Sequence, residues 1–358
     1  MTAAARLLHP LPVIALHSGQ AAETAVDRWI ALRQRCGVKS PSLRHEWLAI
    51  LRRGLGHEPY CIEARQDDAT VGLLPLCFLN TRLFGRFLVG LPYLNVGGVI
   101  AQDEFVAASL IDRAVQLADD LDVRYLELRH ERRWSHPALN YDSTQKVHMR
   151  LALPTEEDEL WRQLKPKVRN QIRKAEQNEL AIEWGAHELL DDFFRVFAVN
   201  MRDLGTPVFS RRLFAAILDN FGADAEICVV RHRGEPCAAG VLVHGDGMAE
   251  VPSASSLRRL NHLNPNMLLY WSMLRRCIAR RHSEFDFGRT TIGSNTHRFK
   301  AQWGAEPYPG VWQYYVRRGT VDDMRPDNPK LQRRIALWKK MPVWLTRLIG
   351  PYIIRGIP

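Results

Sequence analysis

The segment FDFGRTTIGSNTHRFKAQWGAEP, residues 285–307, places one lysine, Lys300, between the aromatic residues Phe299 and Trp303. It reads as a buried strand over 285–288, a polar loop, and a helix-like turn that carries the lysine. Three roles fit this setting: a structural lysine lying over Trp303, a general base with a pKa lowered by its surroundings, or a charged group that stabilises an oxyanion or phosphate. We favour the third role for Lys300, because it requires only position and dryness, and we expect Phe299 and Trp303 to line the substrate site.

A second candidate is the basic stretch LWRQLKPKVRNQIRKAEQN, residues 160–178. After Pro166 its apolar residues recur at helical spacing, which predicts a helix with one buried face. The basic residues cluster near the start of that helix, where backbone N–H groups also favour anions. This pattern predicts substrate binding by Lys167, Arg169, Arg173 and Lys174, and a solvated face is the alternative.

Two further basic residues stand at predicted helix starts, Arg211 in SRRLFAAIL and Arg44 in SLRHEWLAIL. Arginine suits phosphate because its planar fork donates two parallel hydrogen bonds. We predict that Arg44 and Arg211 bind substrate, and a plain surface role is the alternative for each. We also expect Lys300, Arg169 and Arg211 to share a groove between two halves of the protein.

Composition excludes several other classes. The sequence has no GxSxG, HExxH, P-loop or paired cysteine–histidine pattern, so it predicts neither a metal site nor a bound cofactor. Of the net charge of +10, +7 falls after residue 316, as ten Lys/Arg against three Asp, so the body does not predict a general nucleic-acid surface.

The six cysteines form no CxxC pair and predict buried thiols in a reducing compartment. The N-terminal residues do not have the pattern of a signal peptide, and no uncharged apolar stretch reaches 18 residues. We therefore expect a cytoplasmic protein.

A weak internal sequence repeat indicates how the chain is organised. Residues 40–76 and 208–244 share an order of helix, strand, polar turn and strand, at an offset of 167 to 168 residues. A repeat of this length predicts two copies of one domain. We place the first domain at 1–153, the second at 154–318 and a basic amphipathic tail at 319–358.

Each half is predicted to run helix–helix–β–β–β–helix–β–helix–β, with KVHMRLAL closing the first half and VWQYYV closing the second. This is the order of the GNAT acyltransferase fold. We therefore predict an α/β (α+β) protein of two tandem GNAT-like domains with a helical tail.

Three segments, KPKVRNQIRKAEQN, SPSLRHEWL and DFGRTTIGSNTHRFKAQWGAEP, together resemble the FemAB-like family of tandem-GNAT proteins. The resemblance covers about residues 40–316 and is closest to the branch associated with exosortase (PEP-CTERM) and exopolysaccharide loci. It implies transfer of an acyl or aminoacyl group to an amine or hydroxyl of a peptidoglycan, other cell-envelope or exopolysaccharide precursor. By the same resemblance, Lys300 contacts substrate and stabilises charge, and Arg211 helps to hold a nucleotide-linked acceptor.

The donor implied by the resemblance is an aminoacyl-tRNA or an acyl-CoA. The chain shows no coiled-coil arm for tRNA, and RRLNHLNPN, residues 258–266, has no glycine where GNAT enzymes cradle a pyrophosphate. The alternative is a non-catalytic GNAT-like module that binds a nucleotide-sugar or a lipid-linked glycan.

The tail segment 330–355 mixes Lys and Arg with Trp, Leu and Ile. A basic amphipathic segment of this kind is typical of peripheral contact with an anionic membrane surface. Docking of the tail on its own body or on a second subunit is the alternative.

Overall fold

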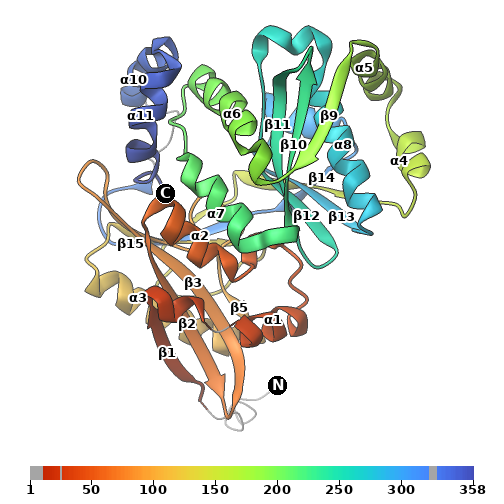
Figure 1. The fold of residues 1–358 in the computed structure, drawn as a ribbon. Helices are drawn as coiled ribbons and strands as arrows, with labels where there is room; N and C mark the ends of the chain where they lie inside the picture. The colour runs from red at the N-terminus through yellow and green to blue at the C-terminus, as the bar shows by residue number, and fades with distance from the viewer. Residues whose placement is uncertain (1–10, 25, 322–328) are drawn as a thin grey trace.

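The computed structural model describes residues 11–24, 26–321 and 329–358, so the predictions for the first ten residues and for 322–328 lie outside the described residues. Two mixed sheets form the body, one for each half of the chain (Figure 1). This arrangement confirms the prediction of a tandem GNAT-like α/β fold with a helical tail. All six cysteines are free, and five of them are buried.

The first sheet has the strand order β1-β2-β3-β4-β6-β15-β7, with β5 paired to β3. Its strands from the first half are β1 (Val13–Ser18), β2 (Glu58–Gln66), β3 (Ala69–Thr81), β4 (Gly85–Val89), β5 (Ile100–Ala101), β6 (Tyr125–His130) and β7 (Tyr141–Ser143). Its helices are α1 (Val26–Arg35), α2 (Glu46–Leu55) and α3 (Glu104–Asp120). Helix α3 packs on one face of this sheet through apolar residues at helical spacing.

The second sheet has the order β14-β8-β13-β12-β11-β10-β9. Its strands are β9 (Leu180–Gly185), β10 (Ala225–His232), β11 (Glu235–His244), β12 (Met248–Ser256), β13 (Glu284–Thr291), β14 (Glu306–Pro309) and the earlier strand β8 (Lys146–Ala152). The helices of this half are α4 (Glu157–Gln163), α5 (Pro166–Gln177), α6 (Leu190–Leu204), α7 (Arg211–Phe221), α8 (Pro265–Ala279) and α9 (Asn295–Ala301). Helices α5 and α8 share one core with this sheet.

The two halves exchange strands, which corrects the prediction that each half closes on its own last strand. Strand β8 pairs antiparallel with β13 and β14 in the second sheet. Strand β15 (Val311–Val316) pairs with β6 and β7 in the first sheet. Residues 131–140 also contain no helix, so the predicted helix before the last strand exists only in the second half, as α9. The strand patterns were right, but strand pattern does not specify which sheet a strand joins.

The halves also meet through the two helices that belong to the internal sequence repeat, α2 and α7. Gly54 of α2 lies so close to Leu213 of α7 that a Cβ at position 54 would stand 2.7 Å from the Leu213 Cα. Ser210, the N-cap of α7, donates to the Gly54 carbonyl at 3.0 Å. The largest hydrophobic core contains residues of both halves, including Trp47 and Phe214. The junction is therefore a continuous packed interior.

The described part of the tail forms two helices, α10 (Pro329–Lys340) and α11 (Val343–Ile354). Both lie beside α6 at one end of the molecule (Figure 1). In the described residues, no helix combines the length and apolarity needed to cross a membrane.

Candidate active site at the junction of the two halves

Strands β12 and β13 separate at the junction of the halves. They pair in parallel over only three positions, ending with Glu250 opposite Asp286. Beyond that point β12 pairs with β11, and β13 pairs with β8 after a bulge between Asp286 and Arg289. Arg150 of β8 is the register partner of Asp286. Since register partners face the same side of a sheet, Glu250, Asp286 and Arg150 form a row of charged side chains on one face.

In the first half, the equivalent strands β4 and β6 also separate, but a loop of the chain fills the space between them. Strands β4 and β6 pair in parallel at only two positions, ending with Val89 and Glu127. The chain then loops through 90–98 and returns to β6, where Gly97 and Arg129 exchange two backbone hydrogen bonds of 3.0 and 3.1 Å. This loop fills the divergence in the first half with main chain, whereas β13 pairs only with β8 beyond Asp286.

Lys300 lies just past the point where β12 and β13 separate. Helix α9 is capped by Ser294, and its last turn directs the Lys300 Nζ to the carbonyls of Gly288 and Arg289, at 2.9 and 3.0 Å. Gly288 adopts φ +80°, which only glycine adopts without strain, so the bulge presents its carbonyl to the amine. Burial lowers the pKa of Lys300 to about 8, and the nearby Asp286 carboxylate partly offsets that effect.

Glu250 is a buried carboxyl group held by the first half. Its carboxyl accepts from Ser42 Oγ at 2.7 and 2.9 Å and from Asn95 Nδ2 at 2.7 Å. Burial raises the pKa of Glu250 to about 8, and the neighbouring Asp286 adds to this rise. Asn95 lies in the 90–98 loop, where Leu91 and Tyr93 adopt φ values of +46° and +72°. Non-glycine residues in this conformation store strain, which is concentrated at functional sites.

Asp286 is fully buried, and through Arg150 it is connected to Glu131 of the first half. It accepts from the Gly288 N–H at 2.6 Å and from Arg150 Nε at 3.3 Å. Arg150 also pairs with Glu131 of the first half and lies over the Tyr308 ring at 4.1 Å from its centroid. Because β8 belongs to the second sheet, the strand exchange is what brings Arg150 to both carboxylates.

A second cationic group is buried beside this row. Arg129 and Arg289 both donate to the Leu94 carbonyl, at 2.9 and 3.2 Å. Both guanidinium groups lie over the ring of Trp312, which belongs to the exchanged strand β15. Burial lowers the pKa of Arg289 to about 9, and Arg129 adds to that lowering. Arg129 also pairs with the buried Glu127 at 2.6 Å, so the junction gathers charges of both signs in a dry environment, where electrostatic interactions are strong.

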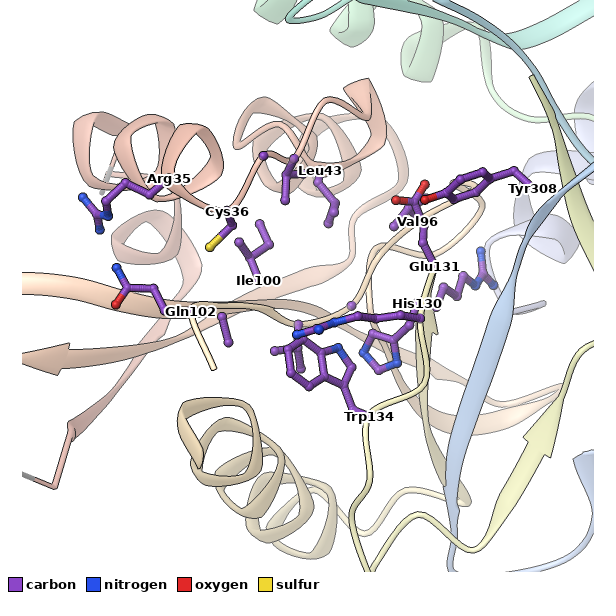
Figure 2. A pocket seen from close by; sticks show the side chains of 17 residues that line it. Arg35, Cys36, Leu43, Val96, Ile100, Gln102, His130, Glu131, Trp134 and Tyr308 are labelled. Atoms are coloured by element: carbon purple, nitrogen blue, oxygen red, sulfur yellow. The ribbon is translucent and has the colours of Figure 1, made fainter. Parts of the chain in front are cut away.

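A pocket of about 850 Å³ opens next to these residues (Figure 2). It lies mainly in the first half, and Tyr308 of β14 contributes from the second. Two of its residues, Leu43 and Val96, directly follow the Glu250 partners Ser42 and Asn95. The lining comprises Arg35, Cys36, Gly37, Val38, Leu43, Val96, Gly98, Val99, Ile100, Ala101, Gln102, Arg129, His130, Glu131, Arg132, Trp134 and Tyr308.

The pocket wall carries two buried nitrogen atoms that have no hydrogen-bond partner within the part of the chain that the structure describes, Arg129 Nη2 and His130 Nε2. The other ring nitrogen of His130, Nδ1, lies 3.2 Å from Gln313 Oε1. Gln313 in turn accepts from the Trp134 N–H and donates to its carbonyl, so its amide orientation is defined. His130 Nδ1 therefore carries the proton, and burial lowers the His130 pKa to about 3. The wall offers one charged donor and one neutral acceptor.

The structure places the three predicted residues around Lys300 in different ways. Lys300 is buried, but it bonds to backbone carbonyls and makes no contact with the Trp303 ring face among the described residues. Trp303 is 2% exposed and packs with Phe299, Phe287 and Tyr270 in the core of the second half. Phe299, which belongs to α9, thus packs the helix against Trp303 and Tyr270.

The predicted arginines at helix starts have internal partners. Arg44 donates to Asp224 and to the His244 carbonyl, both at 2.8 Å, and stacks on Phe221. It therefore ties the first half to the second. Arg211 is exposed and pairs with Asp191 at 2.6 Å.

Helix α5 holds the remaining predicted residues. Lys167, Arg173 and Lys174 are exposed on its surface, and Arg173 lies over Trp161. Arg169 is half-buried, and its Nε has no partner among the described residues. No contact in the described residues joins Lys300, Arg169 and Arg211, so the shared groove stays a prediction.

The residues that sequence reasoning missed are those contributed across the junction, Ser42, Asn95, Glu250, Arg150 and Arg289. Of these residues, only Glu250 could have been recognised from the sequence, because it is the single charged residue in the strand MAEVPSASS. A charged residue in a buried strand is expensive unless it is paired or functional.

The chain has a tandem GNAT-like fold. In a comparison with known families, residues 162–308 match the profile described as "Acetyltransferase (GNAT) domain". This match covers most of the second half, including β12, β13 and α9. Among curated proteins, no sequence matches this chain.

Solved structures resemble the whole chain in fold at low sequence identity. FemX is 12% identical with a TM-score of 0.62, over 86% of this chain and 99% of FemX. The C-terminal domain of a putative lysylphosphatidylglycerol synthetase from Agrobacterium fabrum is 13% identical with a TM-score of 0.53, over 83% and 92%. A tandem GNAT protein from the clavulanic acid biosynthesis pathway is 14% identical with a TM-score of 0.52, over 84% and 98%.

Proposed function

We propose that this protein is a FemAB-like transferase, which moves an acyl or aminoacyl group to an amine or hydroxyl of a cell-envelope or exopolysaccharide precursor. The likeness to FemX and to a lysylphosphatidylglycerol synthetase domain supports this class, as does the GNAT match over the second half. The observation that carries the proposal is the buried Lys300 ammonium beside the separated strands β12 and β13.

The Lys300 ammonium has one N–H left after donating to the Gly288 and Arg289 carbonyls. An acyl carbonyl placed between the separated strands would meet this third N–H. Negative charge develops on that carbonyl oxygen when the acceptor attacks, and a fixed cation in a dry site stabilises it strongly. Removing one such donor typically costs roughly 10²–10³ in rate.

Glu250 is the proposed proton carrier. A general base is most effective when its pKa lies near the working pH, and burial brings the pKa of Glu250 to about 8. Ser42 and Asn95 fix its orientation from the other half. A surface glutamate would be ionised at neutral pH but too weak a base for this task.

The proposed step is a direct acyl transfer. The acceptor nitrogen or oxygen forms a bond to the acyl carbon while its proton passes to the Glu250 carboxylate. The bond from the acyl carbon to the donor then breaks, and the leaving sulfur of an acyl-CoA or ribose oxygen of an aminoacyl-tRNA takes that proton. Lys300 remains protonated throughout and holds the charge of the intermediate.

The pocket beside the cluster is the proposed acceptor site. Arg129 Nη2 supplies a buried donor for an anionic oxygen, and His130 Nε2 supplies an acceptor for an O–H or N–H. Arg132 stacked on Trp134, with 3.7 Å between its Cζ and the ring centroid, adds a cation at the wall. These features favour a phosphate-bearing, nucleotide- or lipid-linked acceptor.

One observation favours a non-catalytic module that binds a nucleotide-sugar or lipid-linked glycan instead. The turn before α8, Arg258–Leu263, has no glycine, so it lacks the usual cradle for a donor pyrophosphate. Such a module would use the same pocket and would leave Lys300 as a structural residue.

A single screen separates the two functions. The protein is incubated with acyl-CoAs or aminoacyl-tRNA in the presence of UDP-linked or lipid-linked sugars, and products are identified by mass spectrometry. Binding is measured in parallel by thermal shift. Acyl transfer to any of these acceptors supports the transferase, whereas acceptor binding without product from every donor supports the module.

A further inference from the structure

Helix α11 uses one of its faces to dock on the body of the protein. Thr346, Gly350 and Ile354 recur at a spacing of four residues and are buried. A Cβ on Gly350 would stand 2.9 Å from the Val208 nitrogen, so this glycine permits close contact with the segment before α7. The docked face fixes which way the rest of the helix points.

The opposite face of α11 is apolar and exposed. Trp344, Leu348 and Tyr352 also recur every four residues, and they are 67%, 61% and 74% exposed. They lie about half a turn away from the docked residues on the helical wheel. We call these three residues the tail face. Large exposed apolar side chains gathered on one helix face mark an interaction surface.

Cationic side chains are exposed on the same two tail helices as the tail face. Lys339 and Lys340 are exposed at the end of α10, directly before α11, and Arg333 and Arg334 are exposed one turn or more earlier. None of these four forms an ion pair with any described residue. Arg347 is also exposed, one turn beyond Trp344, and its guanidinium lies over the ring of Phe194.

We propose that the tail face inserts into the interfacial region of an anionic membrane, with these cations contacting lipid headgroups. Trp and Tyr favour this region because their rings are apolar and their polar tips remain hydrated. Cations that pair with no described residue, next to the apolar strip, suit anionic headgroups, whereas a second copy of this basic protein would bring like charges together. The inference is independent of the proposed function, since it rests on α10 and α11 alone.

The test is co-sedimentation of the full chain with vesicles of phosphatidylglycerol and phosphatidylcholine, compared with phosphatidylcholine alone. Wild type is expected to bind the anionic vesicles preferentially and to release them at high salt. The variant Leu348→Ser is expected to bind roughly tenfold more weakly, because it removes one apolar side chain that insertion into the membrane would bury. The triple variant W344S/L348S/Y352S is expected to lose binding. Phe105→Ser, at an exposed site on α3, is the matched control and should bind as wild type.

The contribution of the tail cations to vesicle binding is measured separately, with variants of Lys339 and Lys340. Replacing Lys339 and Lys340 by glutamine should weaken binding to the anionic vesicles by roughly 30-fold, at about 1 kcal/mol for each charge near the surface. All variants should keep the unfolding temperature of wild type, because the changed side chains are exposed. Unchanged sedimentation of the triple variant would overturn the proposal. So would a dimer of the wild type that dissociates in the triple variant while no vesicle binding is seen.

Discussion

Replacing Lys300 by methionine should change the pH dependence of stability in a defined way. Folding lowers the pKa of this amine from 10.5 to about 8, mainly through burial. This difference corresponds to about 3 kcal/mol of unfavourable free energy for burying the charge. The penalty is present in full below pH 8, where Lys300 is charged in both states. It disappears between pH 8 and about 10.5, where the folded protein binds fewer protons than the unfolded chain.

The variant also loses two hydrogen bonds, to the carbonyls of Gly288 and Arg289. Each carbonyl left without this donor costs about 1–3 kcal/mol if it finds no other partner. The two effects oppose each other, about 2–6 kcal/mol lost against about 3 kcal/mol relieved, so Lys300→Met should unfold within about 3 kcal/mol of wild type at pH 7. Between pH 8 and 10.5, the wild type should gain about 3 kcal/mol relative to the variant.

Urea denaturation at pH 7, 8 and 10 measures these differences. Lys174→Met is the matched control, because Lys174 is exposed on α5 and its replacement should leave the pH dependence unchanged. If Lys300→Met and wild type keep a constant difference in unfolding free energy across this range, Lys300 is not a buried, strained cation. A loss well above about 3 kcal/mol at pH 7 would identify it as a structural anchor of the β13 bulge.

Three further predictions concern its neighbours. The transfer rate should follow a narrow bell-shaped pH profile near pH 8, because Glu250 must lose its proton and Lys300 must keep its own. Glu250→Gln should remove the rising limb of this profile and lower the rate by roughly 10²–10⁴. Relative to wild type, the variant should also gain stability as the pH rises from about 4.5 to 8, because the folded wild type binds one more proton there than the unfolded chain. A rising limb that survives in Glu250→Gln would assign the proton transfer elsewhere. Gly288→Ala should cost about 1–3 kcal/mol in urea denaturation, because φ is +80° and the new Cβ would lie 3.3 Å from Asn95 Nδ2; unchanged stability would show that the bulge is not strained. Asn95→Ala should move the rising limb to higher pH, as the Glu250 carboxylate loses a donor; an unmoved limb would contradict this contact.

Sequence reasoning predicted the fold because the signals for the fold are local and repeated. Periodicity located the helices and strands, and the sequence repeat that includes α2 and α7 identified two copies of one unit. The exchange of β8 and β15 could not be predicted in this way. Both strands alternate in the usual manner, and their partners are chosen by contacts from residues more than a hundred positions away.

The candidate site shows the same limit. Lys300 could be singled out because a loop, a glycine and aromatic residues surround it in sequence. The charged cluster beside it is assembled from other parts of the chain: Asn95 of a first-half loop holds Glu250 of β12, and Arg150 of an exchanged strand holds Asp286. Local charge runs were the weaker guide, since Arg44 proved to be a link between the halves.

The transfer rate of Lys300→Met, measured on a donor and acceptor that the wild type uses, shows whether the buried ammonium acts in catalysis. A charged donor at the developing oxyanion predicts a rate lower by roughly 10²–10³, with the unfolding transition of the variant still cooperative and close to that of wild type. A rate within a few-fold of wild type would contradict the proposal that Lys300 stabilises the developing oxyanion, because the buried ammonium at the junction would then take no part in the chemistry.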